Sequence, residues 1–161
     1  MLGVAIMEEI TVLDVKPQLV AGIRKKGYYR EIAELLPKLY EYATKKGAKF
    51  TAPPIFVCHE TAEEAMEADK TGTAYVEVAA PIAEKIEETE EIKCYTLPGG
   101  KMAKTIHKGP YDKCEPTYNK IFAWIEKNGK KIVGPTREAY LNDPREVGLE
   151  EALTEIYIPI N

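Results

Sequence analysis

The chain contains two copies of one sequence pattern, and this internal repeat constrains the fold more than any other feature. The segment KGYYREIAELLPKLYEYATKKGAKFTAPP, residues 26–54, aligns without a gap with KGPYDKCEPTYNKIFAWIEKNGKKIVGPT, residues 108–136. Both glycines, one tyrosine and one proline match in register, which the shared lysines alone would rarely produce. The pattern indicates a duplication of one structural unit.

The segments that close the two copies also align. YVEVAAPI, residues 75–82, matches LTEIYIPI, residues 153–160. At this length one domain is expected. We therefore predict a single domain over 1–161, with repeat one at about 8–82 and repeat two at about 92–160. The acidic, turn-rich stretch EKIEETEE joins the two repeats.

Each copy predicts a strand region, a helix and two further strands. Apolar and β-branched residues typical of strands open both copies, at 8–15, 18–27, 92–98 and 101–109. Apolar residues then recur at the spacing of one helix face. Two more strand-like segments close each copy. Two such units predict an α+β fold, an antiparallel-rich sheet with both helices on one face.

The prolines of the two helices predict where each helix begins. Pro37 and Pro116 are tolerated in a first helical turn, where backbone N–H groups have no helical partner. We therefore expect the regular helices to begin near Leu35 and Glu115.

The composition argues against several kinds of site and partner. The 22 basic residues are scattered and the net charge is −4, which argues against direct nucleic-acid binding. The three cysteines and two histidines show no metal-binding spacing, so no metal and no other cofactor is expected. An odd number of cysteines fits a reducing compartment, and no apolar run reaches membrane length. We expect a cytoplasmic protein that contacts neither membrane nor DNA.

The first residues carry no targeting signal. The apolar stretch in MLGVAIMEEI is too short for a signal peptide, and no basic segment precedes it. Met7 is an alternative start, in which case residues 1–6 form a disordered extension. The sequence does not choose between Met1 and Met7.

Side-chain alternation in the closing strands predicts a second, polar face of the sheet. Successive side chains of a strand point to opposite faces. The aliphatic residues of both strands share the face that suits packing under the helices. Glu155 and Tyr157 share the opposite face, as do Tyr75 and Glu77 in the first copy. This face is expected to line a ligand groove.

A carboxylate among aromatic rings is costly to ionise without a partner, because burial disfavours its charged form. A cationic ligand removes this cost, and aromatic faces attract cations as well. Either Glu155 or Glu77 is alternatively a solvated residue paired with a lysine. Trp124 either caps the groove or covers the edge of the core. His107, whose repeat mate is Lys25, is expected at an exposed strand end.

Three motifs in the second copy resemble the GyrI-like, or bacterial effector-binding, domain family: GPY before a helix, YLNDP after it, and the closing TEIYIPI. The resemblance covers about residues 8–160. It implies a duplicated strand–helix–strand–strand fold with a small-molecule groove between the halves. By motif match it implies ligand-facing roles for Glu155, Tyr157 and Tyr140. Strand alternation and helix spacing add Tyr75, Glu77 and Trp124 to the candidate ligand-binding residues, and Tyr111 is the remaining candidate.

The resemblance implies three alternative functions. In multidrug-sensing transcription regulators the domain follows a DNA-binding module and binds lipophilic cations. Here no such module precedes it, so we expect a stand-alone domain that binds amphipathic, cationic or aromatic compounds as a sensor or sequestering protein. Some relatives resemble hydrolases of strained cyclopropanoid electrophiles, in which Glu155 would be the general base. Others resemble gyrase-modulating proteins, which would imply a protein partner. The ligand, catalytic turnover and the oligomeric state stay open.

Overall fold

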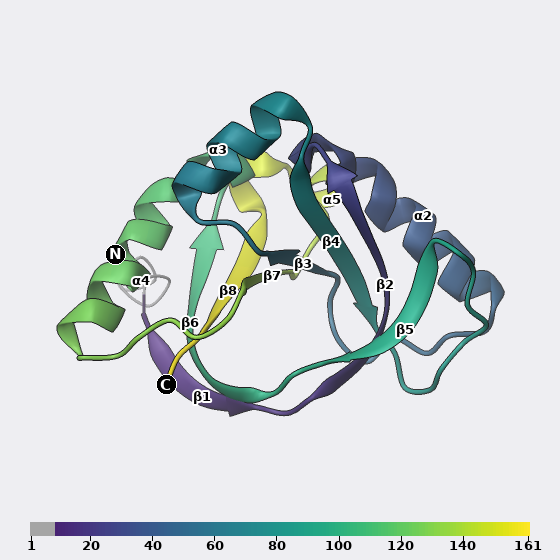
Figure 1. Cartoon of the computed structure of the whole chain (residues 1–161), viewed down its shortest axis with the longest axis horizontal. Helices are drawn as coiled ribbons and strands as arrows, with labels where there is room; N and C mark the ends of the chain where they lie inside the picture. Colours follow the sequence, from purple (N-terminus) through teal and green to yellow (C-terminus); the bar gives the residue numbers. More distant parts are fainter. Residues whose placement is uncertain (1–8) are drawn as a thin grey trace. The chain divides into compact units, whose positions relative to one another are not determined.

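The structure is a computed structural model, and it describes residues 9–161. The question of a start at Met1 or Met7 concerns residues outside this range. The chain folds into two compact units. The first unit is Lys16–Gly99, and the second unit combines residues 9–15 with Gly100–Asn161 (Figure 1).

The first unit is a four-stranded antiparallel sheet in the order β3-β4-β2-β5. Its elements are β2 (Gln18–Gly27), the 3-10 turn η1 (Tyr29–Glu31), α2 (Ile32–Lys45), β3 (Ile55–Cys58), α3 (Ala62–Thr71), β4 (Ala74–Pro81) and β5 (Ile92–Leu97). The long helix α2 packs on β4 and β2.

The second unit repeats this plan, with the strand order β1-β6-β8-β7. Its elements are β1 (Thr11–Val15), β6 (Gly100–Lys108), η2 (Tyr111–Lys113), α4 (Glu115–Lys127), β7 (Thr136–Tyr140), α5 (Pro144–Val147), η3 (Leu149–Glu151) and β8 (Leu153–Pro159). Helix α4 packs on β6. The predicted α+β fold of two strand–helix–strand–strand repeats with antiparallel strands is confirmed.

Equivalent strands of the two units pair in the same register. Arg24 lies opposite Glu77 in the first unit, and Ile106 lies opposite Glu155 in the second. These are the pairs that the sequence alignment makes equivalent. The duplication therefore extends from the sequence to the backbone hydrogen bonding, and equivalent positions of the two units can be compared directly.

The unit boundaries differ from the sequence repeats by one strand at each junction. β1 precedes the first unit in the sequence but pairs with β6 of the second, and β5 pairs with β2 of the first. Only Lys16 and Pro17 separate β1 from β2, and only Pro98 and Gly99 separate β5 from β6. Two-residue hairpins need positive φ angles that proline cannot adopt, so neither strand folds back on its neighbour in sequence.

One helix start was predicted correctly and the other was not. Helix α4 begins at Glu115 as expected, with Pro116 in its first turn. Helix α2 begins at Ile32 rather than near Leu35, which places Pro37 inside the helix. The preceding turn explains the earlier start, because the Glu31 carboxylate accepts the Tyr28 backbone N–H at 2.7 Å and so organises the chain before Ile32.

Helix α3 was not predicted, although the sequence carries both of its end signals. Thr61 and Glu64 form a reciprocal capping box at its start. Gly72 ends the helix with a φ angle of 70°, the left-handed conformation that glycine adopts readily. The apolar stripe of α3 is too short to be recognised from periodicity, and none of the residues of this helix is buried.

The aliphatic strand faces pack under the long helices as alternation predicted. Val76 and Val78 of β4 lie in one core cluster with Leu39 of α2. In the second unit Ile156 and Ile158 of β8 lie with buried residues of α4. Among residues 9–161, no helix has the length and apolar character needed to cross a membrane.

The two helix prolines allow a matched stability test. Replacing Pro37 with Ala is expected to raise the free energy of unfolding by about 1–3 kcal/mol, because Ala restores an N–H donor and removes a ring clash inside the helix. Pro116→Ala in the first turn of α4 should leave stability unchanged or lower it by up to about 1 kcal/mol, through greater freedom of the unfolded chain. Urea denaturation of both variants checks this difference, and equal responses would contradict it.

Candidate functional site

Three glutamates on the strands lie among tyrosines, but their electrostatic surroundings differ. Glu77 is on β4, Glu155 is on β8, and Glu138 is on β7. The first two were predicted from alternation, whereas Glu138 was not. The partners of each carboxylate decide which of them is available to a ligand.

The Glu155 carboxylate already binds a cation of its own unit. Lys104 Nζ lies 2.6 Å from one carboxylate oxygen, and the Tyr157 hydroxyl donates to the other at 3.1 Å. The Lys104 ammonium also lies 5.7 Å from the centre of the Tyr157 ring. Burial, together with the Glu155 charge, raises the pKa of Tyr157 to about 12. A cationic ligand at Glu155 would therefore compete with Lys104.

The Glu77 carboxylate has even more protein partners. Its side chain is only 1% exposed. His59 Nε2 lies 2.6 Å from one oxygen. The other oxygen accepts the Tyr95 hydroxyl at 2.7 Å and lies 3.2 Å from Arg24 Nε. The Arg24 guanidinium also stacks 3.9 Å from the centre of the Tyr95 ring. This carboxylate is buried, neutralised and hydrogen-bonded on both oxygens, as buried charges require.

A glycine makes room for the cluster around Glu77. A Cβ atom at Gly22 would lie 2.2 Å from the Tyr95 hydroxyl oxygen, so only glycine lets this ring lie over β2. Lys104 occupies the equivalent register position of the second unit, opposite Tyr157. Glu77 and Glu155 are equivalent, but Arg24 neutralises the first and Lys104, at a different strand position, neutralises the second.

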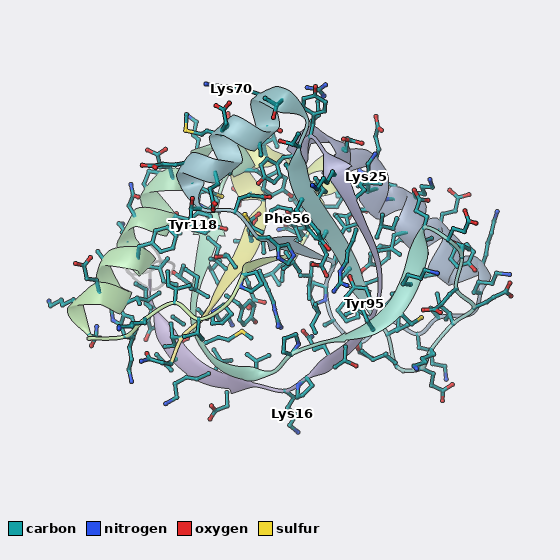
Figure 2. The ribbon with its side chains drawn as sticks, viewed as in Figure 1. Lys16, Lys25, Phe56, Lys70, Tyr95 and Tyr118 are labelled. Atoms are coloured by element: carbon teal, nitrogen blue, oxygen red, sulfur yellow. The ribbon has the colours of Figure 1, made fainter. Side chains whose placement is uncertain are left out.

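Glu138 has hydrogen-bond donors but no lysine or arginine partner among the described residues. The Tyr118 hydroxyl of α4 donates to one carboxylate oxygen, and the Tyr140 hydroxyl donates to the other at 3.2 Å. Within residues 9–161, no lysine or arginine forms an ion pair with Glu138. Burial raises the pKa of the Glu138 carboxyl, although both tyrosine hydrogen bonds and the nearby His107 act to lower it. Figure 2 labels Tyr118 among the side chains of the second unit.

Tyrosine side chains surround the Glu138 carboxylate. The rings of Tyr140 and Tyr111 meet edge to face, with centroids 5.4 Å apart. Burial raises the pKa of the Tyr140 hydroxyl well above its ordinary value, yet both Tyr140 and Glu138 keep part of their surface accessible to solvent. The Glu138 carboxylate is therefore surrounded by protein atoms and still reached by solvent. We call Tyr111, Tyr118, Glu138 and Tyr140 the Glu138 recess.

The neighbouring strand adds a free polar group to this region. Thr154 of β8 lies opposite Tyr140 on one side and His107 on the other. It is fully buried, and within the described part of the chain its hydroxyl finds no hydrogen-bond partner. A buried polar atom left unpaired is uncommon and marks a place where a water or ligand group can bind.

The first unit is apolar at the equivalent positions. Residue by residue, Glu138, Tyr118 and Thr154 correspond to Phe56, Leu36 and Val76. Glu138 lies opposite Ile156 of β8, so it stands on the helix-covered face of the sheet where its counterpart is a core phenylalanine. The second copy therefore carries a carboxylate and hydroxyls at positions that the first copy uses for packing.

The predicted site residues do not all meet at one place. Tyr140 and Tyr111 belong to the Glu138 recess. Glu155 and Tyr157 point to the opposite face of the second unit's sheet, because Tyr140 lies opposite Thr154 and alternation reverses the next residue.

The other predicted residues have protein partners. Trp124 packs against the core cluster under α4. In the first unit, the ring of Tyr75 lies 4.7 Å from that of His59, beside Glu77. The expectation of an exposed strand-end His107 was wrong, because His107 is only 6% exposed.

Sequence reasoning did not single out Glu138 or Tyr118. The signal was present in the repeat alignment, where an acid stands in place of Phe56. It was missed because alternation was applied to β8 and β4 but not to the shorter strand β7.

The family comparison decides what kind of domain carries this recess. The model of the GyrI-like small molecule binding domain matches residues 8–161. The chain belongs to this family. No curated protein matches this GyrI-like chain significantly.

Several solved structures share the fold of this GyrI-like domain. The EcmrR C-terminal domain has a TM-score of 0.82 at 22% identity, over 95% of this chain and 97% of that domain. The EcmrR chain in a cryo-EM complex with DNA has a TM-score of 0.81 at 22% identity. The match covers 95% of this chain but only 57% of the EcmrR chain.

Two further structures are similar at lower identity. A hydrolase from Listeria innocua, encoded by lin2189, has a TM-score of 0.70 at 16% identity, over 98% of this chain and 94% of that one. SAV2435 bound to tetraphenylphosphonium has a TM-score of 0.62 at 16% identity, over 95% of this chain and 94% of that one.

The electrostatic difference between Glu138 and Glu155 predicts opposite effects of substituting them at neutral pH. The folded-state pKa of Glu138 is raised by burial, so folding binds its proton more tightly and stability falls as pH rises above the unfolded carboxyl pKa. Glu138→Gln should therefore match the wild type near pH 4 and become the more stable protein as pH rises to neutral. Glu155→Gln should instead lower stability at neutral pH by about 1–2 kcal/mol, because it leaves Lys104 without its anion.

Urea denaturation of the three proteins at several pH values measures this. A Glu138→Gln variant that loses stability at neutral pH would contradict the unpaired state of this carboxylate.

Proposed function

We propose that this GyrI-like domain binds an amphipathic cationic compound in the Glu138 recess and acts as a sensor or sequestering protein for such compounds. One observation carries the proposal: Glu138 is a buried carboxylate among tyrosines that forms no ion pair with any described lysine or arginine. Its charge is left for a partner from outside the chain.

The energetics of the recess favour a lipophilic cation. Ionising a buried carboxylate without a cation is costly, and an incoming positive charge compensates this cost. The faces and edges of Tyr111, Tyr118 and Tyr140 add apolar contact, and each cation–aromatic contact contributes about 0.5–2 kcal/mol. The hydroxyls hold the carboxylate oxygens in place. A strongly hydrated cation such as an alkylammonium gains less, because it gives up more hydration on entry.

The comparisons support this class of ligand. The family is one of small-molecule binding domains, and SAV2435, which shares the fold, was solved with tetraphenylphosphonium. Tetraphenylphosphonium is a cation surrounded by aromatic rings and has no hydrogen-bond donor. It therefore tests charge and aromatic contact without a contribution from donor hydrogen bonds.

The predicted set of Glu155, Tyr157, Glu77, Tyr75 and Trp124 remains a second candidate site. There a cationic ligand would have to displace Lys104 from Glu155 or Arg24 from Glu77. That exchange replaces one cation with another and gains little. We therefore assign the ligand to Glu138 first.

Hydrolysis is the alternative function, and the burial of Glu138 favours it. A carboxylate whose pKa burial raises is a better general base at neutral pH. Glu138 would take a proton from water as the water attacks an electrophilic carbon, and a tyrosine hydroxyl would donate a proton to the leaving group. The Listeria innocua hydrolase shares the fold, which supports testing this chemistry but does not identify a substrate.

We propose a cytoplasmic location and no direct contact with DNA. Cys58, Cys94 and Cys114 form no disulfide bond, which suits a reducing compartment. In the EcmrR–DNA complex this chain corresponds to only part of the longer chain. A protein partner such as gyrase is the third candidate, and no described surface favours it over a small molecule.

Calorimetric titration with tetraphenylphosphonium tests the binding proposal. We expect micromolar affinity at neutral pH. Glu138→Gln should weaken binding by roughly 10–100-fold, because it removes the attraction between two opposite unit charges, about 2–3 kcal/mol at a separation of about 6–8 Å and an effective dielectric constant of about 20. Glu155→Gln is the matched control and should change the dissociation constant less than about threefold. The affinity should rise with pH, since the cation binds the ionised carboxylate and the free recess favours the protonated one.

If Glu155→Gln weakened tetraphenylphosphonium binding more than Glu138→Gln did, Glu155 would be the ligand-binding carboxylate. Incubation with strained electrophiles, followed by mass spectrometry, separates binding from turnover. Product formation that disappears in Glu138→Gln would favour the hydrolase alternative over a binding module.

A further inference from the structure

His107 connects the two chain segments that carry recess tyrosines. Its ring is buried at the end of β6. Nδ1 lies 2.8 Å from the Thr117 hydroxyl, and Nε2 lies 3.0 Å from the Pro110 carbonyl oxygen. Pro110 immediately precedes Tyr111, and Thr117 immediately precedes Tyr118. One imidazole thus joins the turn before Tyr111 to the first turn of α4 before Tyr118.

The partners determine which nitrogen carries the proton in the neutral ring. A carbonyl oxygen only accepts hydrogen bonds, so Nε2 must donate to Pro110. Nδ1 of the neutral ring then accepts the Thr117 hydroxyl proton. When the ring is protonated, Nδ1 becomes a donor, and the Thr117 hydroxyl must turn its own proton elsewhere. Protonation therefore reverses the contact with α4.

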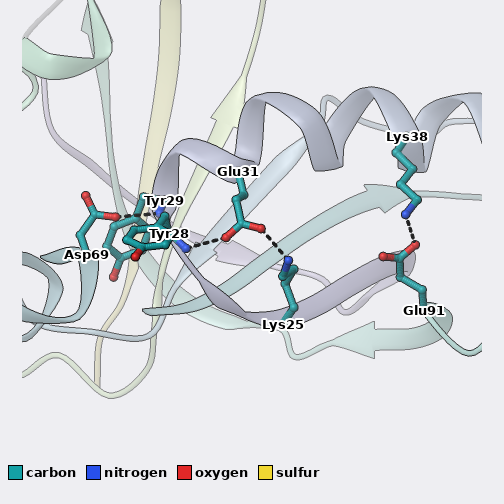
Figure 3. Close-up of polar contacts among 7 residues, drawn as sticks. All are labelled: Lys25, Tyr28, Tyr29, Glu31, Lys38, Asp69 and Glu91. Carbon is teal, nitrogen blue, oxygen red and sulfur yellow. Dashed lines mark hydrogen bonds and ion pairs between the residues drawn. The ribbon is translucent and has the colours of Figure 1, made fainter. Parts of the chain in front are cut away.

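The first unit performs the same structural task with permanently charged groups. Lys25 occupies the position equivalent to His107, and its ammonium lies 2.5 Å from the Glu31 carboxylate. The other oxygen of Glu31 accepts the Tyr28 backbone N–H at 2.7 Å. Figure 3 shows this connection between the end of β2 and the turn before α2. In the first unit an ion pair between Lys25 and Glu31 joins the strand end to the turn. In the second unit, which carries the Glu138 recess, the imidazole ring of His107 makes the equivalent connection.

We propose that His107 is a positioning residue of the Glu138 recess, which holds Tyr111 and Tyr118 in place when neutral and weakens cation binding when protonated. This inference rests on the proposed function of the recess. His107 does not contact the ligand. It acts by holding the two segments that it joins and by its charge.

The groups around the ring set the direction of the pH effect. Glu138 on β7 is the carboxylate that His107 acts on electrostatically. α4 contributes the Thr117 hydroxyl, the turn contributes the Pro110 carbonyl, and Thr154 lies opposite on β8. A protonated ring and a bound cation would share one carboxylate and repel each other. Cation binding should therefore be weaker when His107 is protonated.

Three variants of the full chain separate positioning from titration. His107→Gln keeps a hydrogen-bonding side chain but cannot be protonated near neutral pH. His107→Leu keeps apolar volume and loses both hydrogen bonds. Lys25→Leu removes the equivalent connection of the first unit and is the matched control. Thermal melts establish that each variant folds, and tetraphenylphosphonium affinity is then measured by calorimetry between about pH 5 and 8, the range in which histidine titrates.

We expect His107→Leu to lose roughly tenfold in affinity at the upper end of this range, equivalent to about 1.4 kcal/mol, and Lys25→Leu to match the wild type. His107→Gln should recover most of the affinity, but its affinity should rise less steeply with pH. Its binding should also release fewer protons, as shown by the dependence of the heat on buffer ionisation. A His107→Gln variant with the wild-type pH dependence would overturn the proposal.

Fluorotyrosine NMR without ligand tests the positioning role independently. Tyr111 and Tyr118 resonances are assigned by Tyr111→Phe and Tyr118→Phe. We expect both resonances to shift with pH between about pH 5 and 8 in the wild type, and to shift clearly less in His107→Gln, where the Glu138 carboxyl remains as a titrating neighbour. Failure of tetraphenylphosphonium to bind the wild type would refute the proposed ligand alone, whereas shifts of equal size in the wild type and in His107→Gln would refute the role of His107.

Discussion

The packing of one aliphatic strand face under one long helix is the interaction on which each unit depends. In the second unit Ile156 and Ile158 of β8 are fully buried beside Ile121 and Ile125 of α4. Burying such side chains contributes about 1.5–3 kcal/mol each, and a one-residue slip would turn every one of them to the wrong face. This packing sets the register of β8, and the register in turn determines which face receives Glu155 and which receives Thr154.

The cost of burying a charge has two different outcomes for the three glutamates. Glu77 and Glu155 lie on the face away from the helices, and each has a cation of its own unit. Glu138 lies on the helix-covered face, where its neighbours are hydroxyls and rings. Burial without a counterion raises the cost of its charge. Availability to a ligand therefore follows from the absence of a partner in the described chain and not from the glutamate–tyrosine pattern itself.

Duplication provides an internal reference for each special position. Where the second unit has Glu138 and Tyr118, the first has Phe56 and Leu36. Both units keep the same strand registers, so the fold tolerates either chemistry at these places. The polar residues of the second unit are thus not needed for folding, and a functional role is the simpler explanation for their cost.

Much of the fold could be predicted from the sequence. Periodicity identified the strands and both long helices, and alternation identified the buried faces of β4 and β8 correctly. Local capping signals also marked α3, although the prediction overlooked them. These features depend on residues close together in the chain, whose physical preferences act within one turn of helix or one strand.

The sequence by itself determined the duplication, the α+β class, the family resemblance and the faces to which Glu77 and Glu155 point. Only the tertiary structure decided that β1 and β5 exchange between the repeats, that Lys104 and Arg24 neutralise the predicted glutamates, and that Glu138 has no lysine or arginine partner within residues 9–161. Strand pairing, ion pairing and burial join residues far apart in the chain, such as Lys104 and Glu155. Their free energies depend on distance in space and on exclusion of water, which a pattern along the sequence does not contain.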